Sequence, residues 1–219
     1  THKKTAESLW IAYGHNPSWV RKEIGKHDKI YGYGEKLEIE KGITSLLESI
    51  KIAGRKKDLN AGNRIHAEIV HKGLFHKNIC INNALISMYV RLGMQDKAQQ
   101  VFDELLLRDV VSWTSLMSGF TLQGQPGKAA QCYKQMLEEA IYPDAVTFTC
   151  ILKAYTSLGS IENGKRIHIM ITKQELLRTN IVLGTALVDM YGKCGMIRKA
   201  QEVFDALLVR DSISWTALI

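Results

Sequence analysis

Apolar residues recur along the chain at spacings of three, four and seven, the periodicity of helices that bury one face. Within residues 79–109, a first stripe comprises Leu85, Met88, Tyr89 and Leu92, and a second comprises Ala98, Val101, Phe102 and Leu105. Gly93 lies between the two stripes, where glycine is typical of a turn. The pattern therefore predicts two amphipathic helices joined by a short turn.

This two-helix pattern repeats, because the sequence matches itself at a shift of 102 residues. The string A-L-I-S-M-Y-V-R-L-G, which begins at Ala84, corresponds to A-L-V-D-M-Y-G-K-C-G, which begins at Ala186. One helix pair cannot bury both of its apolar stripes alone, so such units have to stack around a continuous core. We therefore expect an all-α solenoid of helix-turn-helix repeats.

The strings R-D-V-V-S-W-T and D-A-V-T-F-T mark where successive repeats begin. They divide the chain into repeats over residues 43–78, 79–109, 110–144, 145–180 and 181–211, and residues 212–219 begin a further, truncated repeat. The five complete repeats have lengths of 36, 31, 35, 36 and 31 residues. Residues 1–42 do not match the repeat, and we expect them to form an N-terminal extension or cap.

These alternating lengths, together with A-L-V-D-M-Y-G-K-C-G and the string G-K-R-I-H, resemble the plant pentatricopeptide repeat family, and within it the subclass with three repeat lengths. The resemblance implies a right-handed superhelix in which 43–78 and 145–180 are long repeats, 79–109 and 181–211 are short, and 110–144 is standard. Tetratricopeptide repeats also pair helices, but they keep a fixed period of 34 residues. None of the repeats in this chain has that length.

The charge and composition of the chain indicate which kinds of molecule it can bind. The chain carries 29 Lys and Arg against 22 Asp and Glu, a net charge of +7, which favours partners that bear phosphate. No apolar run is long enough to cross a membrane, and the four cysteines form no C-x-x-C pair. We therefore expect no membrane contact, no metal and no cofactor.

One short motif could indicate catalysis. His66-Ala67-Glu68 has the H-x-E form of a zinc deaminase, but no P-C-x-x-C follows it, and the counterpart of Glu68 is Met170. His66 and His168 occupy the same repeat position, so we interpret them as packing residues. The chain is not expected to be an enzyme or to take a small-molecule substrate.

Recognition of one RNA base per helical repeat by two or three side chains is the mode described for this repeat class. By resemblance, the fifth and the last residue of each repeat reach the edge of the base. The candidate base-reading residues are Asn83 with Asp109, Thr114 with Asp144, Thr149 with Asn180, Thr185 with Asp211, and Thr216 in the truncated repeat. The resemblance implies uracil for the first pair and guanine for both Thr–Asp pairs, whereas long repeats read bases poorly. The predicted RNA motif is U-G-x-G.

Other residues are candidates for holding the bases and the backbone of the RNA. By resemblance, second-position residues sandwich the bases, and here they are Cys80, Val111, Val146, Val182 and Ile213. Arg91 and Lys193 share one position near the end of a first helix, where a cation suits either backbone phosphate or the helix dipole. Trp113 and Trp215 also share a position, and we expect both to pack in the core.

Two functional hypotheses follow from the resemblance. In the first, the chain is the RNA-recognition part of an organellar processing factor that specifies C-to-U editing, and any deaminase domain lies beyond Ile219. In the second, it is an architectural subunit of an organellar ribosome or a similar ribonucleoprotein. Both place it in a mitochondrion or chloroplast with single-stranded RNA, and with editing-complex or ribosomal proteins as further partners.

Overall fold

The computed structural model describes residues 33–75, 78–178 and 180–218, and all the regular elements within these ranges are helical. In chain order they are α3 (Tyr33–Lys56), α4 (Leu59–His71), α5 (Ile79–Arg91), α6 (Gln95–Asp103), α7 (Val110–Leu122), α8 (Pro126–Glu138), α9 (Ala145–Ser157), α10 (Ile161–Lys173), the 3-10 turn η1 (Leu176–Arg178), α11 (Ile181–Lys193), α12 (Ile197–Asp205) and α13 (Ser212–Leu218). None of the described helices is both long and apolar enough to span a membrane.

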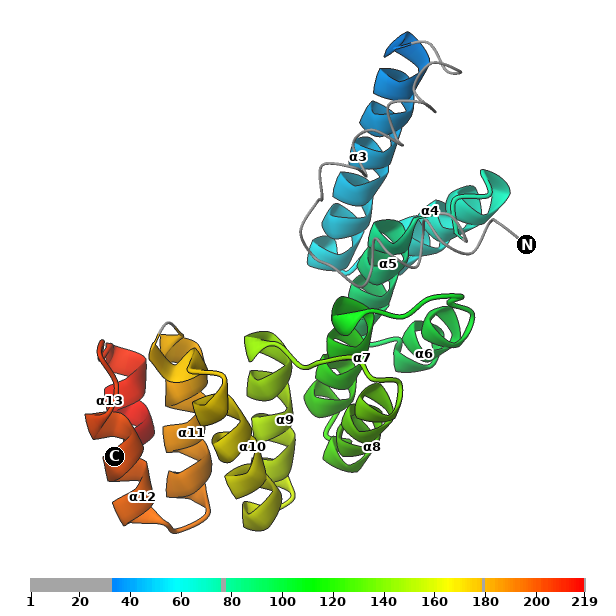
Figure 1. The fold of residues 1–219 in the computed structure, drawn as a ribbon. Coiled ribbons are helices and arrows are strands. Elements are labelled where there is room, and N and C mark those ends of the chain that lie inside the picture. Colours follow the sequence, from blue (N-terminus) through cyan, green and yellow to red (C-terminus); the bar gives the residue numbers. More distant parts are fainter. Residues whose placement is uncertain (1–32, 76–77, 179, 219) are drawn as a thin grey trace.

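The helices form two rows. The first helices of the repeats, α3, α5, α7, α9, α11 and α13, pack against one another in chain order. Each of the helices α4, α6, α8, α10 and α12 packs against the first helix that precedes it, so that successive pairs lie side by side (Figure 1). This arrangement confirms the predicted all-α solenoid.

Five first helices begin at the residues where the sequence divides into repeats, namely Ile79, Val110, Ala145, Ile181 and Ser212. The helix α3 differs, because it begins at Tyr33, upstream of Ile43 and inside the segment that we expected to be an extension. Residues 1–32, which make up most of that expected extension, lie outside the described residues.

The short repeats are short because their second helices lack one turn. The helices α6 and α12 have 9 residues each, whereas α4, α8 and α10 have 13 each. The difference is close to one turn of 3.6 residues. Removing a whole turn shortens the second helix without rotating its apolar stripe away from the core, so repeats of both lengths can join the same stack.

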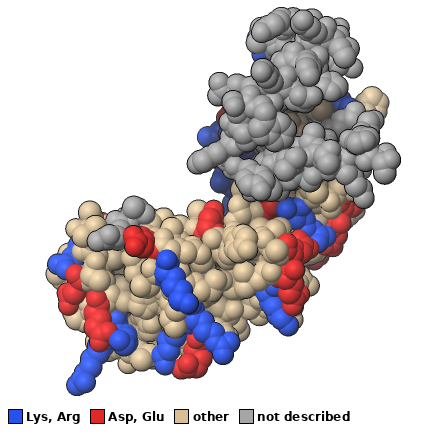
Figure 2. All heavy atoms as spheres, in the orientation of Figure 1, with Lys and Arg blue, Asp and Glu red and all other residues tan. Residues whose placement is uncertain are grey.

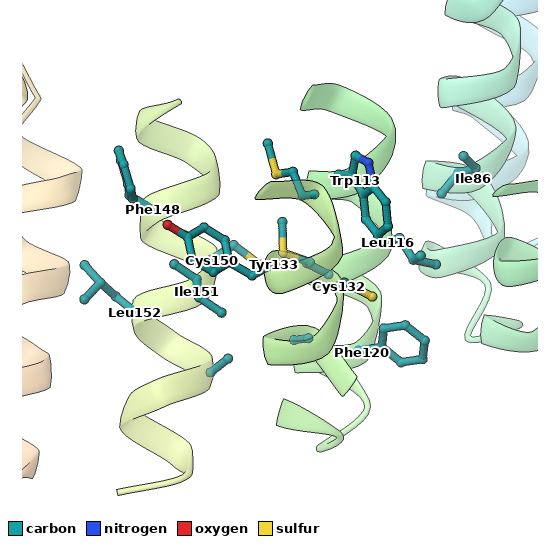
Figure 3. Packing of buried hydrophobic residues seen from close by; sticks show 14 of the residues in the cluster. Ile86, Trp113, Leu116, Phe120, Cys132, Tyr133, Phe148, Cys150, Ile151 and Leu152 are labelled. Carbon is teal, nitrogen blue, oxygen red and sulfur yellow. The ribbon is translucent and has the colours of Figure 1, made fainter. Parts of the chain in front are cut away.

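The core runs between the two rows of helices. Figure 3 shows Trp113, Leu116 and Phe120 of α7, with Cys132 and Tyr133 of α8 beside them. On the other side of this group lie Phe148, Cys150, Ile151 and Leu152 of α9. All of these side chains are buried. Apolar residues that recur with a helical period thus form one continuous core through successive repeats.

An aromatic cluster recurs at both short repeats. Phe102 meets Trp113 edge-on, with ring centroids 4.5 Å apart, and Phe204 meets Trp215 in the same way at 4.6 Å. Trp113 is also held by a hydrogen bond from Nε1 to Glu139 Oε2 of 3.1 Å. Trp113 is 2% exposed, which confirms its expected core position, but Trp215 is 52% exposed. Trp215 lies on α13, the last described helix, and it packs against Phe204 as Trp113 packs against Phe102.

A second contact also recurs at the junction between a long repeat and the next short repeat. His66 Nδ1 lies 2.9 Å from Tyr89 Oη, and His168 Nδ1 lies 2.9 Å from Tyr191 Oη. In both pairs the rings meet edge-on with centroids 5.6 Å apart. Both histidines thus join α4 or α10 to the next first helix, which confirms the packing role expected for them.

Burial sets the protonation of these histidines. Burial lowers the pKa of His66 below its ordinary value of 6.5, and the nearby Glu104 and Lys97 act on it in opposite directions. Burial and Lys199 lower the pKa of His168 in the same sense. A histidine whose pKa is lower in the folded than in the unfolded state disfavours folding once protonated. The stability from both pairs is therefore present above about pH 6.5 and is lost as the pH falls below it.

The difference between the two tryptophans predicts unequal costs of truncation. Trp113→Ala should lower the free energy of unfolding by about 3–5 kcal/mol, because it leaves a cavity in a packed core. Trp215→Ala should cost much less, because half of that side chain already faces solvent. Urea unfolding followed by far-UV circular dichroism measures both variants, and equal costs would contradict the packing described.

The histidine pairs predict a pH dependence of stability. The melting temperature should fall between about pH 7.5 and about pH 5.5, because the two histidines bind protons more tightly in the unfolded state than in their half-buried positions in the folded state. The double variant His66→Gln/His168→Gln should show a shallower fall, since glutamine keeps a polar partner for tyrosine but does not titrate. A double variant with the slope of the parent chain would show that the pH effect arises elsewhere.

Candidate nucleic-acid interface

A row of exposed aliphatic side chains follows the first helices. The second residues of α7, α9, α11 and α13 are Val111, Val146, Val182 and Ile213, which are 50%, 63%, 61% and 65% exposed. Cys80, the second residue of α5, is exposed as well. Because adjacent first helices pack side by side, these residues lie at the same level of successive helices. Their recurrence at one level of the stack makes them a candidate contact surface for a ligand that runs along the repeats.

The last residue of each repeat caps the next first helix. The side chains of Asn78, Asp109, Asp144 and Asn180 each accept a hydrogen bond from the backbone N–H three residues later. Asp211 does the same for Ser214 at the start of α13. Such caps satisfy an N–H group that has no partner within the helix. The residues predicted to read bases from the last position are thus fixed at helix N-termini, beside the row of aliphatic side chains.

The first candidate pair is in direct contact. Asn83 Nδ2 donates to both carboxylate oxygens of Asp109, at 3.1 Å each. A carboxylate only accepts, so the amide nitrogen has to face Asp109. Asn83 Oδ1 is left buried and without a hydrogen-bond partner among the described residues. The pair therefore contains an unsatisfied acceptor that is buried, and its partly exposed member is Asp109.

The second candidate pair is connected through a third residue. Thr114 Oγ1 lies 2.7 Å from Thr147 Oγ1, and Thr147 Oγ1 donates in turn to Asp144 Oδ1 at 2.7 Å. Thr147 is fully buried, whereas Thr114 is half-buried and Asp144 is exposed. The structure thus links Thr114 on α7 to the cap of α9 through a buried hydroxyl group.

The remaining candidates are not joined in pairs. Thr149 donates to the backbone oxygen of Ala145 at 2.8 Å, and Asn180 is occupied as the cap of α11. Among the described residues, Thr185 makes no hydrogen bond through its side chain, and Thr216 donates to the backbone oxygen of Ser212. The structure therefore brings together two of the four predicted pairs.

The two candidate phosphate contacts differ from each other. Arg91 is exposed at the end of α5 and has no ion pair among the described residues. Lys193, at the end of α11, forms an ion pair of 2.9 Å with Asp189 one turn earlier. Figure 2 shows cations and anions interspersed on one face of the molecule rather than a field of one sign. Arg91 is therefore the freer cation of the two.

Two polar residues near the candidate pairs, the exposed Lys153 and the buried Thr147, were not anticipated from the sequence. Lys153 is exposed on α9, four residues after Thr149, and forms no ion pair within the described part of the chain. Its helical spacing from Val146 and Thr149 could have indicated that it shares their face. Thr147 appears in sequence only as a threonine near a helix start, and nothing in the local pattern indicates its contact with Thr114.

The residues of the H-x-E motif are occupied in other contacts. His66 contacts Tyr89, and Glu68 forms an ion pair with Lys72, the residue that follows the end of α4. Among the described residues, no group of three or more His, Cys, Asp or Glu side chains could hold a metal ion. The cysteines are free thiols, and burial raises the pKa of Cys132 to about 12. A thiol with so high a pKa is a poor nucleophile and metal ligand.

Parts of the chain match the models of a known repeat family. Residues 108–157 match the PPR repeat family, and residues 83–110 and 185–211 match the PPR repeat. A pentatricopeptide repeat-containing protein of Arabidopsis thaliana is 38% identical over 157 residues, which are 72% of this chain and 22% of the relative. Two further pentatricopeptide repeat-containing proteins of the same plant, one named chloroplastic and one named mitochondrial, are 33% and 32% identical to this chain. Each match covers 80% of this chain and 28% of the relative. The chain thus spans about a quarter of the length of these relatives.

The fold also has a solved counterpart. The crystal structure of the pentatricopeptide repeat protein PPR10 in complex with an 18-nt psaJ RNA element matches with a TM-score of 0.63 at 20% identity. The match covers 80% of this chain and 26% of that protein. Three findings agree: parts of the sequence match the repeat models, plant proteins with this repeat are similar in sequence, and the solenoid fold is shared. The helical pairs of this chain are therefore pentatricopeptide repeats.

Proposed function

We propose that this chain binds single-stranded RNA and reads it with one repeat per base. The observation that carries this proposal is the placement of Asn83–Asp109 and Thr114–Asp144 beside the exposed aliphatic row. A flat base inserted between successive members of the row would cover their apolar carbons, which water solvates poorly. Its polar edge would then lie against the paired side chains. The PPR10 complex, which shares the fold, contains RNA.

The hydrogen-bonding capacity of each pair supports the bases proposed for it. Asn83 holds the partly exposed carboxylate of Asp109, which can accept the one N–H that uracil carries on its pairing edge. Thr114 and Asp144 offer oxygen atoms, and guanine presents more donors on its pairing edge than any other base. Thr185 with Asp211 has the same composition. By resemblance long repeats read bases poorly, and Thr149 donates to the backbone of its own helix, so the long repeat between these pairs is left unassigned. The proposed motif is U-G-x-G.

The biological setting is proposed from the relatives and from the resemblance of the repeat lengths. Relatives named chloroplastic and mitochondrial support an organelle as the place of action. Within an organelle, an array that recognises a short RNA sequence suits the RNA-recognition part of a factor that directs C-to-U editing by a catalytic domain or partner.

A second candidate function is an architectural subunit of an organellar ribonucleoprotein. It is favoured by one observation, namely that the hydroxyl groups of Thr149 and Thr216 donate to the backbone of their own helices. Repeats in that state would hold RNA through apolar and ionic contacts without distinguishing bases. The two functions differ in whether binding depends on sequence.

Base reading predicts selective losses on truncation. Binding to oligonucleotides varied at the U-G-x-G positions, at a fixed salt concentration near physiological, should prefer that motif. Asn83→Ala should abolish the preference for uracil alone, and Thr114→Ala the preference for the adjacent guanine alone. Thr172→Ala, on the exposed surface of α10, removes the same kind of hydroxyl away from the aliphatic row and is the matched control. Binding that is tight but blind to sequence would favour the architectural function.

The aliphatic row predicts a loss of affinity without a loss of preference. Val111→Ser should weaken binding by roughly tenfold whichever base is present, because a base covers less apolar surface beside a serine. Val70→Ser is a matched control, since Val70 lies on the second helix α4 and is 55% exposed, close to the 50% of Val111. Equal effects of both substitutions, or no effect of either, would show that the row does not contact RNA.

A further inference from the structure

The buried hydroxyl of Thr147 lies between the two side chains of one candidate base-reading pair. It is 2.7 Å from Thr114 Oγ1 on one side and 2.7 Å from Asp144 Oδ1 on the other. The backbone N–H of Thr147 also donates to Asp144 Oδ1, at 2.8 Å. Thr147 is 0% exposed, so it cannot touch a base itself. Any influence it has on RNA has to pass through Thr114 or Asp144.

The chemistry of the three side chains fixes which atom donates in each of the two hydrogen bonds, Thr114–Thr147 and Thr147–Asp144. A carboxylate can only accept, so the contact with Asp144 uses the hydrogen of the Thr147 hydroxyl. A hydroxyl has one hydrogen, so Thr147 can only accept in its contact with Thr114. The hydrogen of Thr114 therefore points inward to Thr147. The oxygen of Thr114 then presents only acceptor capacity to the surface.

An acceptor-only Thr114 beside an anionic Asp144 makes a site that accepts from a base at both positions. The pairing edge of guanine supplies two adjacent donors, N1–H and N2–H. Adenine places an acceptor, N1, where guanine places N1–H, and two facing acceptors repel each other. A threonine hydroxyl that could turn would donate to adenine instead, so holding it in one direction is what distinguishes the two purines.

The other Thr–Asp pair in the chain lacks this link. Ser214, the counterpart of Thr147 near the start of α13, donates through Oγ to the backbone oxygen of Asp211 and accepts from the Asp211 N–H. Its hydroxyl is therefore used by the backbone of the cap residue, and Thr185 makes no side-chain hydrogen bond among the described residues. Ser112, before Thr114 on α7, is bonded in the same backbone manner to Asp109.

We propose that Thr147 is a positioning residue that sets the base preference of the Thr114–Asp144 pair, by holding the Thr114 hydroxyl as an acceptor. This inference rests on the proposed base reading and deepens it. Two repeats with the same Thr–Asp pair are accordingly unequal. The pair joined by Thr147 discriminates guanine from adenine more strongly than the pair Thr185–Asp211 does.

The first test needs no variant. The parent chain is measured against oligonucleotides with guanine, adenine or inosine opposite the repeat 110–144, and separately opposite the repeat 181–211. Adenine has an acceptor at N1 where guanine has N1–H, so its binding opposite 110–144 should be roughly fivefold to tenfold weaker than that of guanine, and the loss opposite 181–211 should be smaller. Inosine keeps N1–H and is the control, since its loss relative to guanine should not differ between the two positions. Equal losses for adenine at the two positions would overturn the role of Thr147.

The second test is a double-mutant cycle. Thr147→Val keeps the shape of the side chain and the backbone N–H that Asp144 accepts, but it releases the Thr114 hydroxyl. It should lower the guanine-over-adenine ratio of Kd values opposite 110–144 by roughly fivefold to tenfold. The ratio opposite 181–211 should stay unchanged, which also shows that the variant is folded. In a Thr114→Val background, Thr147→Val should have no added effect, because the two residues act as one unit.

The outcomes separate this inference from the proposed function. A parent chain that prefers no base at either position would refute base reading, and the role of Thr147 with it. A parent chain that prefers guanine, combined with a Thr147→Val variant of unchanged ratio, would overturn the role of Thr147 alone. Additive effects of Thr114→Val and Thr147→Val would do the same, because they would show that Thr147 does not act through Thr114.

Discussion

The side-by-side packing of the first helices is the constraint on which the rest of this structure depends. A helix pair such as α7 and α8 leaves apolar surface on its flanks, and only the neighbouring pairs cover it. Once each first helix has to lie against the next, residues at one repeat position are arranged along one level of the stack. The exposed row from Val111 to Ile213 is a direct product of that arrangement.

The residues that end each repeat cap helices, and on the proposed function they also contact bases. Asp109 and Asp144 stabilise the N-termini of α7 and α9, and their carboxylates are also members of the candidate base-reading pairs. A cap has to lie at a helix start, and the helix starts lie beside the aliphatic row. Under the proposed function, stability and recognition would be coupled at these positions, because replacing the carboxylate would remove a cap that contributes about 1 kcal/mol as well as a polar group for the base.

Equal residue pairs do not make equal sites in this array. Thr114 with Asp144 and Thr185 with Asp211 match in sequence, yet only the first pair is linked through a buried hydroxyl. The difference lies in a buried residue behind each pair. The Thr147 hydroxyl donates to the Asp144 side chain, whereas the Ser214 hydroxyl donates to the backbone oxygen of Asp211. The environment of a pair, and not only its composition, sets which hydrogen-bonding atoms reach a ligand.

The sequence by itself determined the helical class, the solenoid and the residues at which successive first helices begin. These follow from local causes, since apolar periodicity, a turn glycine such as Gly93 and a capping side chain act within a few residues of each other. The same reasoning placed His66 and His168 in packing contacts. It did not foresee that α3 begins at Tyr33, because residues 33–42 carry no match to the repeat.

Only the tertiary structure decided which side chains meet across helices. Trp113 donates from Nε1 to Glu139, 26 residues later in the chain, and its local sequence does not indicate that contact. Asn83 reaches Asp109 and Thr114 reaches Thr147 from different helices, over separations of 26 and 33 residues. Such contacts depend on how far apart the stacked helices lie and which rotamers fit between them. That distance is a property of the packed array, and no local stretch of sequence encodes it.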